Sequence, residues 1–232
     1  MPPIGIVSDL HGNLPAVEAV WRELEDVDRI YCLGDIVGIG PHPGKVVSKL
    51  MDDERVVKVM GNHDLNTING TDLGPTNNVP RQPHHGWVRD QLDDRQLAFL
   101  NGPFDTTLAY AGRSMRFMHR HPVDCWSKVP YLDRPFPEVL DEFYRDVEGG
   151  ILFFGHTHFP LDVTGASGRR YLNPGAVGVQ NKGRASFLIV NDGEDGPAVE
   201  RREAAYDVPS VIRDIRRQSV PYAEFIIANF FS

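Results

Sequence analysis

Cysteine is scarce in this sequence: a chain of 232 residues contains two, Cys32 and Cys125. Two thiols in a chain of this length do not form the disulfide framework of a small secreted protein. Cys32 lies in the apolar run from Ile30 to Leu33, which favours a small buried side chain. We therefore expect a protein of a reducing compartment.

Long apolar runs and an excess of positive charge are also absent. No stretch approaches the roughly 20 apolar residues of a membrane helix, and the chain opens Met1-Pro2-Pro3 without a basic segment or cleavage site. Asp and Glu number 32 against 24 Lys and Arg, a formal charge of −8. A chain with this net negative charge has no overall positive electrostatic potential to attract a phosphate backbone. A local pocket that binds phosphate is still compatible with it. We expect a soluble cytoplasmic protein that binds neither membranes nor extended nucleic acid.

The composition is otherwise that of an ordinary globular protein, with 41% hydrophobic and 24% charged residues. This excludes wholesale disorder, a collagen-like fibre and a coiled coil. No internal repeat, low-complexity tract or linker divides the chain. We therefore expect one α/β domain spanning residues 1–232.

Apolar runs alternate with helical patterns in the first sixty residues. The first helix is expected to begin after Asn13, an N-cap residue followed by Pro15. A strand, helix, strand, helix, strand order is typical of right-handed crossovers in a parallel sheet. The three runs that predict buried strands are 4–8, 30–33 and 56–60.

Later segments are less regular. Residues 65–86 are rich in Asn, Gly and Pro and predict a long loop. The last eight residues carry five large apolar side chains, so this end is expected to pack on the body of the protein or on a neighbouring copy. Further strands are expected at 115–118, 151–154, 170–172, 185–190 and 198–203, and helices at 87–100, 137–147 and 208–218.

Polar clusters follow the first three predicted strands. Asp9 comes after the first, Asp35 after the second and Asn62 after the third, at intervals of 26 and 27 residues. One strand-helix-strand unit takes about 30 residues, so these side chains are expected at the carboxyl ends of three parallel strands. Open α/β sheets bind their ligands at that edge.

The second half of the chain supplies imidazoles. His119 ends one predicted strand, and Gly155-His156-Thr157-His158 ends another. In extended backbone, Asp9 would share a face with His11, and His156 with His158. Such nitrogen and oxygen donors suit Mn²⁺, Fe²⁺, Zn²⁺ or Ni²⁺ rather than a thiolate site. Seven candidate ligands suit two ions that share one carboxylate: Asp9, His11, Asp35, Asn62, His119, His156 and His158.

Each motif alone also has an ordinary structural explanation. Asp-x-His can be a capped turn, His-Thr-His a solvated loop, and Gly-Asn-His-Asp a turn, because all four of its residues favour turns. Their joint occurrence, in order and at the ends of strands, favours the metal site.

This ordered set of motifs resembles the signature of the calcineurin-like metallophosphoesterase superfamily. The segment 172–178, Leu-Asn-Pro-Gly-Ala-Val-Gly, extends the similarity to the compact bacterial and archaeal phosphodiesterase branch. The resemblance implies an α/β fold of two packed mixed sheets flanked by helices. It also implies that His63 faces the phosphoryl oxygens and is not a ligand. One ion would take Asp9, His11, Asp35 and His158, and the other would take Asp35, Asn62, His119 and His156, with Asp35 bridging.

Three departures from the family pattern bear on function. The protein serine/threonine phosphatases continue the second motif with Asp and Arg, whereas Asp35 here precedes the apolar segment 36–40, which counts against a protein phosphatase. The compact branch often has Cys where His63 stands, and His63 restores an acid/base group. The fourth motif is usually His-Gly, but here Arg120 follows His119, and we expect Arg120 to face solvent rather than phosphate.

The resemblance implies a phosphoesterase with two divalent ions, Mn²⁺ preferred and Fe, Zn or Ni as alternatives. A hydroxide bridging the ions would attack phosphorus in line, and His63 would stabilise charge or protonate the leaving group. The preferred substrate is a small phosphodiester. A phosphomonoester or a dinucleoside polyphosphate fits the same centre.

Two other functions stay open. A catalytically silent metal-binding scaffold is disfavoured because no ligand is missing, and a nuclease acting on polymer because the acidic chain has no basic stripe. His84 and His85 follow the predicted long loop and could reach into the substrate cleft, but a surface position is preferred. His42 is expected in a loop.

Overall fold

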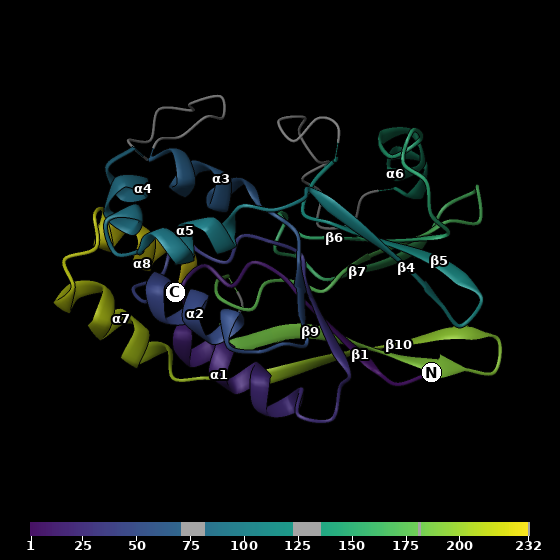
Figure 1. Cartoon of the computed structure of the whole chain (residues 1–232), viewed down its shortest axis with the longest axis horizontal. Helices are drawn as coiled ribbons and strands as arrows, with labels where there is room; N and C mark the ends of the chain where they lie inside the picture. The colour runs from purple at the N-terminus through teal and green to yellow at the C-terminus, as the bar shows by residue number, and fades with distance from the viewer. Residues whose placement is uncertain (71–81, 123–135, 181, 232) are drawn as a thin grey trace.

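Two five-stranded mixed sheets pack against each other in a computed structural model, which describes residues 1–70, 82–122, 136–180 and 182–231 (Figure 1). The strand orders are β10-β9-β1-β2-β3 and β4-β5-β6-β8-β7. In the first sheet β1, β2 and β3 are parallel, and in the second β5, β6 and β8 are parallel, while the other pairings are antiparallel. This confirms the predicted fold class. Cys125 lies outside the described residues.

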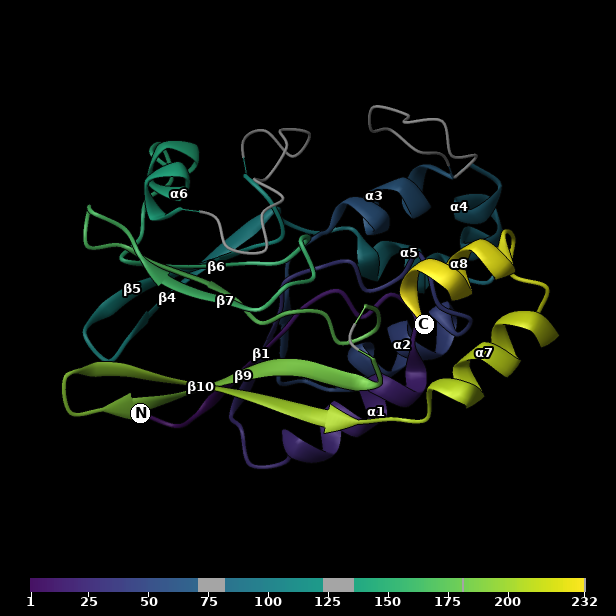
Figure 2. The same cartoon turned by 180° about the vertical axis from the view of Figure 1, so that it is seen from behind.

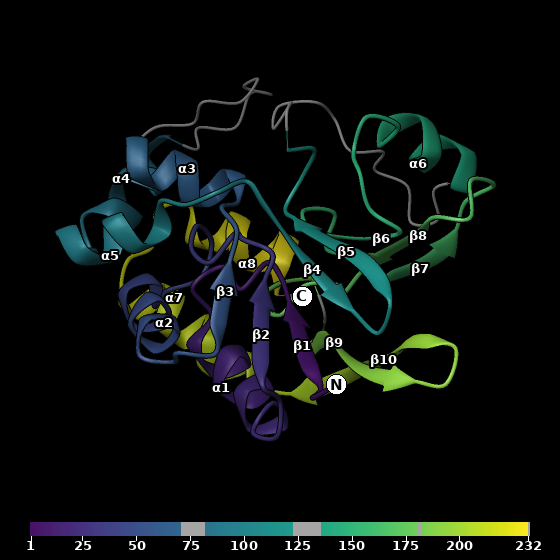
Figure 3. The same ribbon diagram turned by 45° about the vertical axis from the view of Figure 1, so that its right-hand side comes forward.

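The strands have the following bounds. The first sheet contains β1 (Ile4–Val7), β2 (Arg29–Cys32), β3 (Val56–Lys58), β9 (Arg184–Gly193) and β10 (Gly196–Ala205). The second contains β4 (Asp105–Tyr110), β5 (Arg113–Met118), β6 (Ile151–Phe154), β7 (Leu161–Thr164) and β8 (Arg170–Asn173). Figure 3 shows the two sheets side by side, with β1, β2 and β3 ending at the same edge.

Helices cover the outer faces of both sheets. Side chains from α1, α2 and α5 form one core with the first sheet, and α6 packs on the second. The helices are α1 (Leu14–Glu23), α2 (Pro43–Met51), α3 (Asn62–Asn69), α4 (Gln82–Arg89), α5 (Asp94–Leu100), α6 (Pro137–Phe143), α7 (Val208–Arg217) and α8 (Ala223–Phe230). None of the described helices has the length and apolarity that crossing a membrane requires.

The core between the sheets is aromatic and aliphatic. The ring of Tyr31 on β2 stacks on Phe117 of β5 with centroids 4.1 Å apart, and Phe117 stacks on Phe153 of β6 at 5.0 Å. Every residue of β1 and of β6 is buried, because each sheet is covered on both faces. This double coverage explains why these strands are continuous apolar runs in the sequence.

Several predicted elements differ from the structure. The predicted loop 65–86 is helical at both ends, in α3 and α4, and its residues 71–81 are not described. The predicted helix 87–100 is two helices, because Asp93 caps a new helix by accepting a hydrogen bond from the Gln96 amide. The predicted helix 137–147 ends at Phe143. Strands β4 and β7 were not predicted: they lie at the sheet edges, and their partly exposed, polar sequences have no apolar run.

The C-terminal end of the chain packs on the body of its own subunit, which is one of the two predicted alternatives. Ile226 of α8 and Phe231 are buried in a cluster with Ile39, Val211 and Ile215. Figure 2 shows α8 beside α7, at the end of the molecule away from the β9–β10 hairpin. The C-terminal helix is therefore held by hydrophobic contacts to the body of the protein.

This packing predicts the effect of truncating Ile226, which is 5% exposed. We expect Ile226→Ala to lower the free energy of unfolding by about 2–5 kcal/mol, the usual cost of a cavity left by a buried aliphatic side chain. Phe225→Ala on the same helix is the matched control, since Phe225 is exposed, and we expect a change within about 0.5 kcal/mol. Thermal denaturation measures both. Equal losses in the two variants would contradict the packing.

Candidate metal centre

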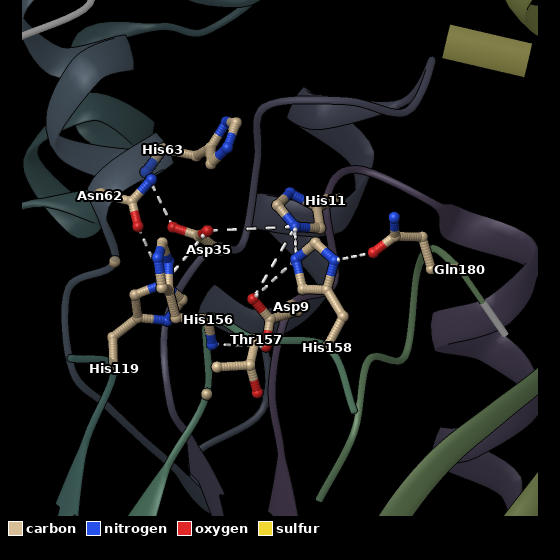
Figure 4. Close-up of polar contacts among 12 residues, drawn as sticks. Asp9, His11, Asp35, Asn62, His63, His119, His156, Thr157, His158 and Gln180 are labelled. Carbon is tan, nitrogen blue, oxygen red and sulfur yellow. Dashed lines mark hydrogen bonds and ion pairs between the residues drawn. The ribbon is translucent and has the colours of Figure 1, made fainter. Parts of the chain in front are cut away.

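The predicted ligands converge at the carboxyl ends of strands from both sheets (Figure 4). Asp9, His11, Asp35 and His119 are almost fully buried although they are polar or charged, and the other residues are half-buried. Asp9 and His11 follow β1, Asp35 follows β2, Asn62 and His63 begin α3 after β3, His119 follows β5, and His156 and His158 follow β6. The structure therefore brings together every site residue predicted from the sequence.

One group of donors surrounds Asp9. Its Oδ1 lies 3.4 Å from the Nε2 of His158 and 3.8 Å from the Nε2 of His11. The two Nε2 atoms are 3.1 Å apart. One ligand atom of each of these three residues lies within 4.8 Å of the others, so the group could hold a metal ion.

A second group surrounds Asp35. Its Oδ2 lies 3.2 Å from the Nε2 of His119, which is also 3.2 Å from the Oδ1 of Asn62. His156 completes a set with Asp35 and His119 whose donor atoms are close enough to share an ion. The same Oδ2 is 3.9 Å from the Nε2 of His11, a member of the first group. Asp35 therefore lies between the two groups.

The carboxylates themselves indicate cation binding. Asp9 Oδ1 and Asp35 Oδ2 are buried and accept no hydrogen bond from the described residues, and imidazole nitrogens face them instead. A buried carboxylate oxygen without a partner is costly. A divalent cation would compensate both oxygens, so the donor set fits metal ions.

Three of the imidazoles are oriented by a second contact. His119 Nδ1 donates to the carbonyl oxygen of Leu33 at 2.8 Å, and His11 Nδ1 to that of Val37 at 3.3 Å. His158 Nδ1 donates to Oε1 of Gln180 at 2.6 Å. Because each acceptor is an oxygen, Nδ1 carries a proton, and Nε2 is the nitrogen that would bind a metal ion in place of its own proton.

The backbone at the ligands is strained. Asp9, His11, Asp35, His156 and His158 have φ between 49° and 69°, a left-handed conformation that costs non-glycine residues roughly 1–3 kcal/mol each. The predicted convergence of Asp9 with His11 is correct in outcome but wrong in its reason, whereas His156 and His158 belong to different donor groups. The side chains of Asp9 and His11 converge through left-handed turns, not through extended backbone.

Asp64, the last residue of Gly-Asn-His-Asp, has a positioning role in the structure that its motif alone did not predict. Its Oδ1 accepts hydrogen bonds from the amides of Ile36 and Val37 at 2.8 and 3.2 Å, and its Oδ2 accepts one from Gly61 at 3.0 Å. The loop after β2 is thereby fixed to the start of α3. An acidic residue three positions after a helix cap is the sequence signal for this contact.

Asp35 is in close contact with the Gly61-Asn62-His63-Asp64 motif. The amide of His63 donates to Oδ1 of Asp35 at 2.8 Å. A Cβ on Gly61 would collide with the side chain and backbone of Asp35. Glycine is therefore required at position 61 so that α3 can begin directly beside Asp35.

Burial and charge set opposite protonation states within the centre. Burial is the main cause that lowers the pKa of His11, to about 4, against the opposing effect of the Asp35 carboxylate. Burial would also lower the pKa of His119, but the adjacent Asp35 carboxylate raises it to about 9. Burial would raise the pKa of Asp9, yet the charge of His158 lowers it to about 2. Burial would likewise raise the pKa of Asp35, but the charge of His119 holds it well below its usual range. Both aspartates are therefore ionised, as cation ligands must be.

A cavity of about 390 Å³ opens over the donors and is also lined by His63, His84 and His85. The predicted surface position of His84 and His85 is wrong: they are 7% and 1% exposed. The first turns of α4 direct them inward, and the ring of His85 lies 5.3 Å from that of His63. No sequence signal marks this contact, which depends on how α4 packs.

Two other polar residues lie away from this cavity. Arg120 is partly buried beside Asn62 and His119, in a separate void of about 10 Å³. His42 is the residue before α2, as a loop position predicts, and its Nε2 contacts Oδ2 of Asp214 at 2.9 Å. The cavity over the donors is therefore shaped without either of them.

Comparisons with known proteins agree with this geometry. Residues 3–195 match the family model of the calcineurin-like phosphoesterase superfamily domain. The uncharacterized protein MJ0912 of Methanocaldococcus jannaschii is 29% identical over 240 residues, covering 94% of this chain and 93% of that protein. A metallophosphoesterase from Sphaerobacter thermophilus has a similar structure, with a TM-score of 0.79, 26% identity and coverage of 98% and 97% of the two chains. The hypothetical protein PH1004 from Pyrococcus horikoshii shares the fold, with a TM-score of 0.83, 20% identity and coverage of 100% and 99%.

The contact between His158 and Gln180 generates a prediction. Gln180→Leu removes the acceptor that orients the imidazole, so we expect the affinity for Mn²⁺ to fall about 10- to 100-fold. Gln180→Glu keeps an acceptor oxygen in place and is expected to retain tight binding. Calorimetric titration of the metal-free protein measures both. Unchanged affinity in Gln180→Leu would show that this hydrogen bond does not position a ligand.

Proposed function

This chain belongs to the calcineurin-like phosphoesterase superfamily, and we propose that it hydrolyses small phosphodiesters with the help of two divalent cations, Mn²⁺ by preference. The family implies a metal-dependent phosphoester hydrolase. The number of ions, their identity and the diester preference are our proposal. The observation that carries it is the position of Asp35 between two groups of donors, each suited to one ion.

The donors divide between the two proposed ions as follows. The first ion would be held by Asp9, His11, Asp35 and His158, and the second by Asp35, Asn62, His119 and His156. The sharing of Asp35 is supported by its Oδ2, which faces His119 at 3.2 Å and His11 at 3.9 Å. Two-metal sites of this kind have their ions about 3.5–4 Å apart, a spacing that one carboxylate can span.

When bound, the cations supply positive charge to the phosphate oxygens and make hydroxide available from water near neutral pH. In this proposal His63 acts on the substrate, although a donor atom of its imidazole also lies within 4.8 Å of donor atoms of His11 and Asp35. It lines the cavity next to the donors, and its ring centroid is 4.9 Å from that of His11. From there its imidazole can protonate the leaving oxygen or stabilise charge on the phosphoryl oxygens.

The lining of the cavity favours a diester over the other substrates of such centres. Within the described part of the chain, no lysine or arginine lines it. A monoester dianion or a polyphosphate gains from such side chains, which bind phosphate oxygens by charge-assisted hydrogen bonds. A diester carries a single negative charge, so the two cations suffice. Phosphomonoesters and dinucleoside polyphosphates are the alternatives.

Completeness of the donor set supports an enzyme rather than a silent scaffold. Four further expectations stay predictions from the sequence: no binding of extended nucleic acid, no binding of membranes, a single domain and a cytoplasmic location.

A screen of the Mn²⁺-loaded protein against aryl diesters, monoesters, cyclic nucleotides and dinucleoside polyphosphates tests the proposal. It predicts the highest kcat/KM for a diester, and a highest value for a monoester or a polyphosphate would contradict it.

Asp35→Asn tests the bridging role. Because a neutral amide cannot compensate two cations, we expect this variant to lose both ions or to retain one loosely, while its fold survives. Elemental analysis after gel filtration measures the metal content, and circular dichroism checks the fold. Two tightly bound ions in the folded variant would contradict the assignment of Asp35 as the shared ligand.

His63→Ala tests the acid/base role. We expect both ions to remain, since His63 is not a ligand in this proposal, and turnover to fall. For an alkyl leaving group the loss should be about 10²- to 10⁴-fold, the usual contribution of a general acid. A nitrophenolate leaving group needs little protonation and should suffer least.

The same variant separates the alternatives. Equal losses for alkyl and nitrophenyl diesters would indicate that His63 stabilises charge on the phosphoryl oxygens instead. Loss of metal from the variant would show that the ligand assignment is wrong.

A further inference from the structure

The cavity over the donors has two chemically different sides. One side carries the carboxylate, amide and imidazole groups of the proposed metal centre. The other is formed by Phe159 and by Tyr222, Phe225 and Phe230 at the C-terminal helix. We call these four side chains the aromatic wall. Three of them belong to residues beyond 195, outside the segment that matches the family model.

Three of the four side chains of the aromatic wall are exposed to solvent. Six large hydrophobic side chains are exposed among the described residues, and three of them, Phe159, Tyr222 and Phe225, line this one cavity. Their exposed fractions are 42%, 39% and 47%. Apolar surface gathered at one concave site is typical of ligand binding, whereas scattered apolar residues need no such explanation.

Tyr222 occupies a position that local structure disfavours. It precedes α8 with φ 62° and ψ 32°, a left-handed conformation, and its side chain forms no capping hydrogen bond. Asn or Gly at this position would avoid the strain. Strained residues cluster at binding sites, where the surrounding structure holds them in place. Here the strained residue adds one ring to the aromatic wall.

A short chain of hydrogen bonds fixes the aromatic wall relative to the proposed metal centre. The amide of Gln180 donates to the carbonyl oxygen of Phe230 at 2.9 Å, and the side chain of Gln180 accepts from His158. Phe159 directly follows His158 in the chain. Phe230 and Phe159 are therefore tied to the donors, which reduces the entropic cost of binding a ligand that contacts both.

We propose that the aromatic wall binds a planar aromatic group of the substrate while its phosphate lies on the metal centre. This rests on the proposed phosphodiesterase function and specifies its substrate class: phosphate esters that carry an aryl ring or a nucleobase. Rings bind to aromatic side chains through their faces. The amides of Asn229 and Gln180 also line the cavity, and they can bond the polar edge of a ring.

The size of the cavity agrees with one such group. Its volume of about 390 Å³ lies at the lower end of small-molecule sites, which span about 300–1,000 Å³. One ring-bearing ester fills it, whereas a polymer would need an open groove. The aromatic wall would thus bind the ring of a small substrate, while the metal centre would bind its phosphate.

Binding of stable phosphonates tests the inference without turnover. Methylphosphonate and phenylphosphonate present the same anionic group to the Mn²⁺-loaded protein and differ by one ring. We expect phenylphosphonate to bind about tenfold more tightly, as stacking on an aromatic side chain predicts. Adenosine 5′-monophosphate against ribose 5-phosphate is the matched pair for a nucleobase. Calorimetry measures the four dissociation constants, and the larger ratio identifies which kind of ring the site prefers.

Variants locate the ring. Phe225→Ala should reduce the preference for phenylphosphonate to within about threefold and leave the affinity for methylphosphonate unchanged. Tyr222→Asn removes a second ring and suits the left-handed backbone, so it should also lower the ratio without loss of fold. Phe136→Ala is the control, because Phe136 is 71% exposed and does not line the cavity.

Failure of the inference is distinguishable from failure of the proposed function. If methylphosphonate binds and aryl diesters are hydrolysed, but neither ring-bearing ligand is preferred, the aromatic wall does not bind substrate. The same holds if Phe225→Ala weakens both phosphonates equally. If no phosphonate binds and no diester is hydrolysed, the proposed function falls and the inference with it.

Discussion

The position of one carboxylate governs the rest of this site. Asp35 is buried, and its Oδ2 faces imidazoles from both groups of donors while its Oδ1 accepts a hydrogen bond from the His63 amide. A buried negative charge without compensation is unfavourable, so the fold must supply positive partners around it. The imidazoles, the start of α3 and the proposed cations all serve that requirement.

The surrounding chain is organised to hold Asp35 in place. Asp64 ties the loop that follows it to the start of α3 through three backbone amides. Gly61 leaves room for the close approach of the two segments. Strained left-handed backbone at five of the seven donors is tolerated because each turn follows directly from a packed strand of one of the two sheets.

Much of this architecture could be predicted from the sequence, and the reasons are physical. Strands such as β1 and β6 are buried on both faces, so they appear as apolar runs, and polar residues directly after them mark the edge where ligands bind. The spacing from Asp9 to Asp35 and from Asp35 to Asn62 then placed three motifs at one edge. These inferences need only local patterns and the geometry of parallel sheets.

The features that could not be predicted depend on tertiary contacts, or on sequence patterns that suit two different local structures. The edge strands β4 and β7 are polar and partly exposed, like loops. Gly-Asn-His-Asp suits a turn as well as the start of α3, and nothing local shows that α4 turns His84 and His85 inward. Gln180 and the aromatic wall meet the donors only in the folded chain. The apolar end was expected to pack as a whole, but Phe225 faces the cavity while Ile226 is buried.

The central claim is that Asp35 is shared by two cations, and a crystal structure of the Mn²⁺-loaded protein tests it most directly. Anomalous scattering from manganese locates each ion without reference to the protein atoms. The account predicts two peaks about 3.5–4 Å apart, with an oxygen of Asp35 in contact with both. A single peak, or two peaks of which one lies away from Asp35, would contradict it.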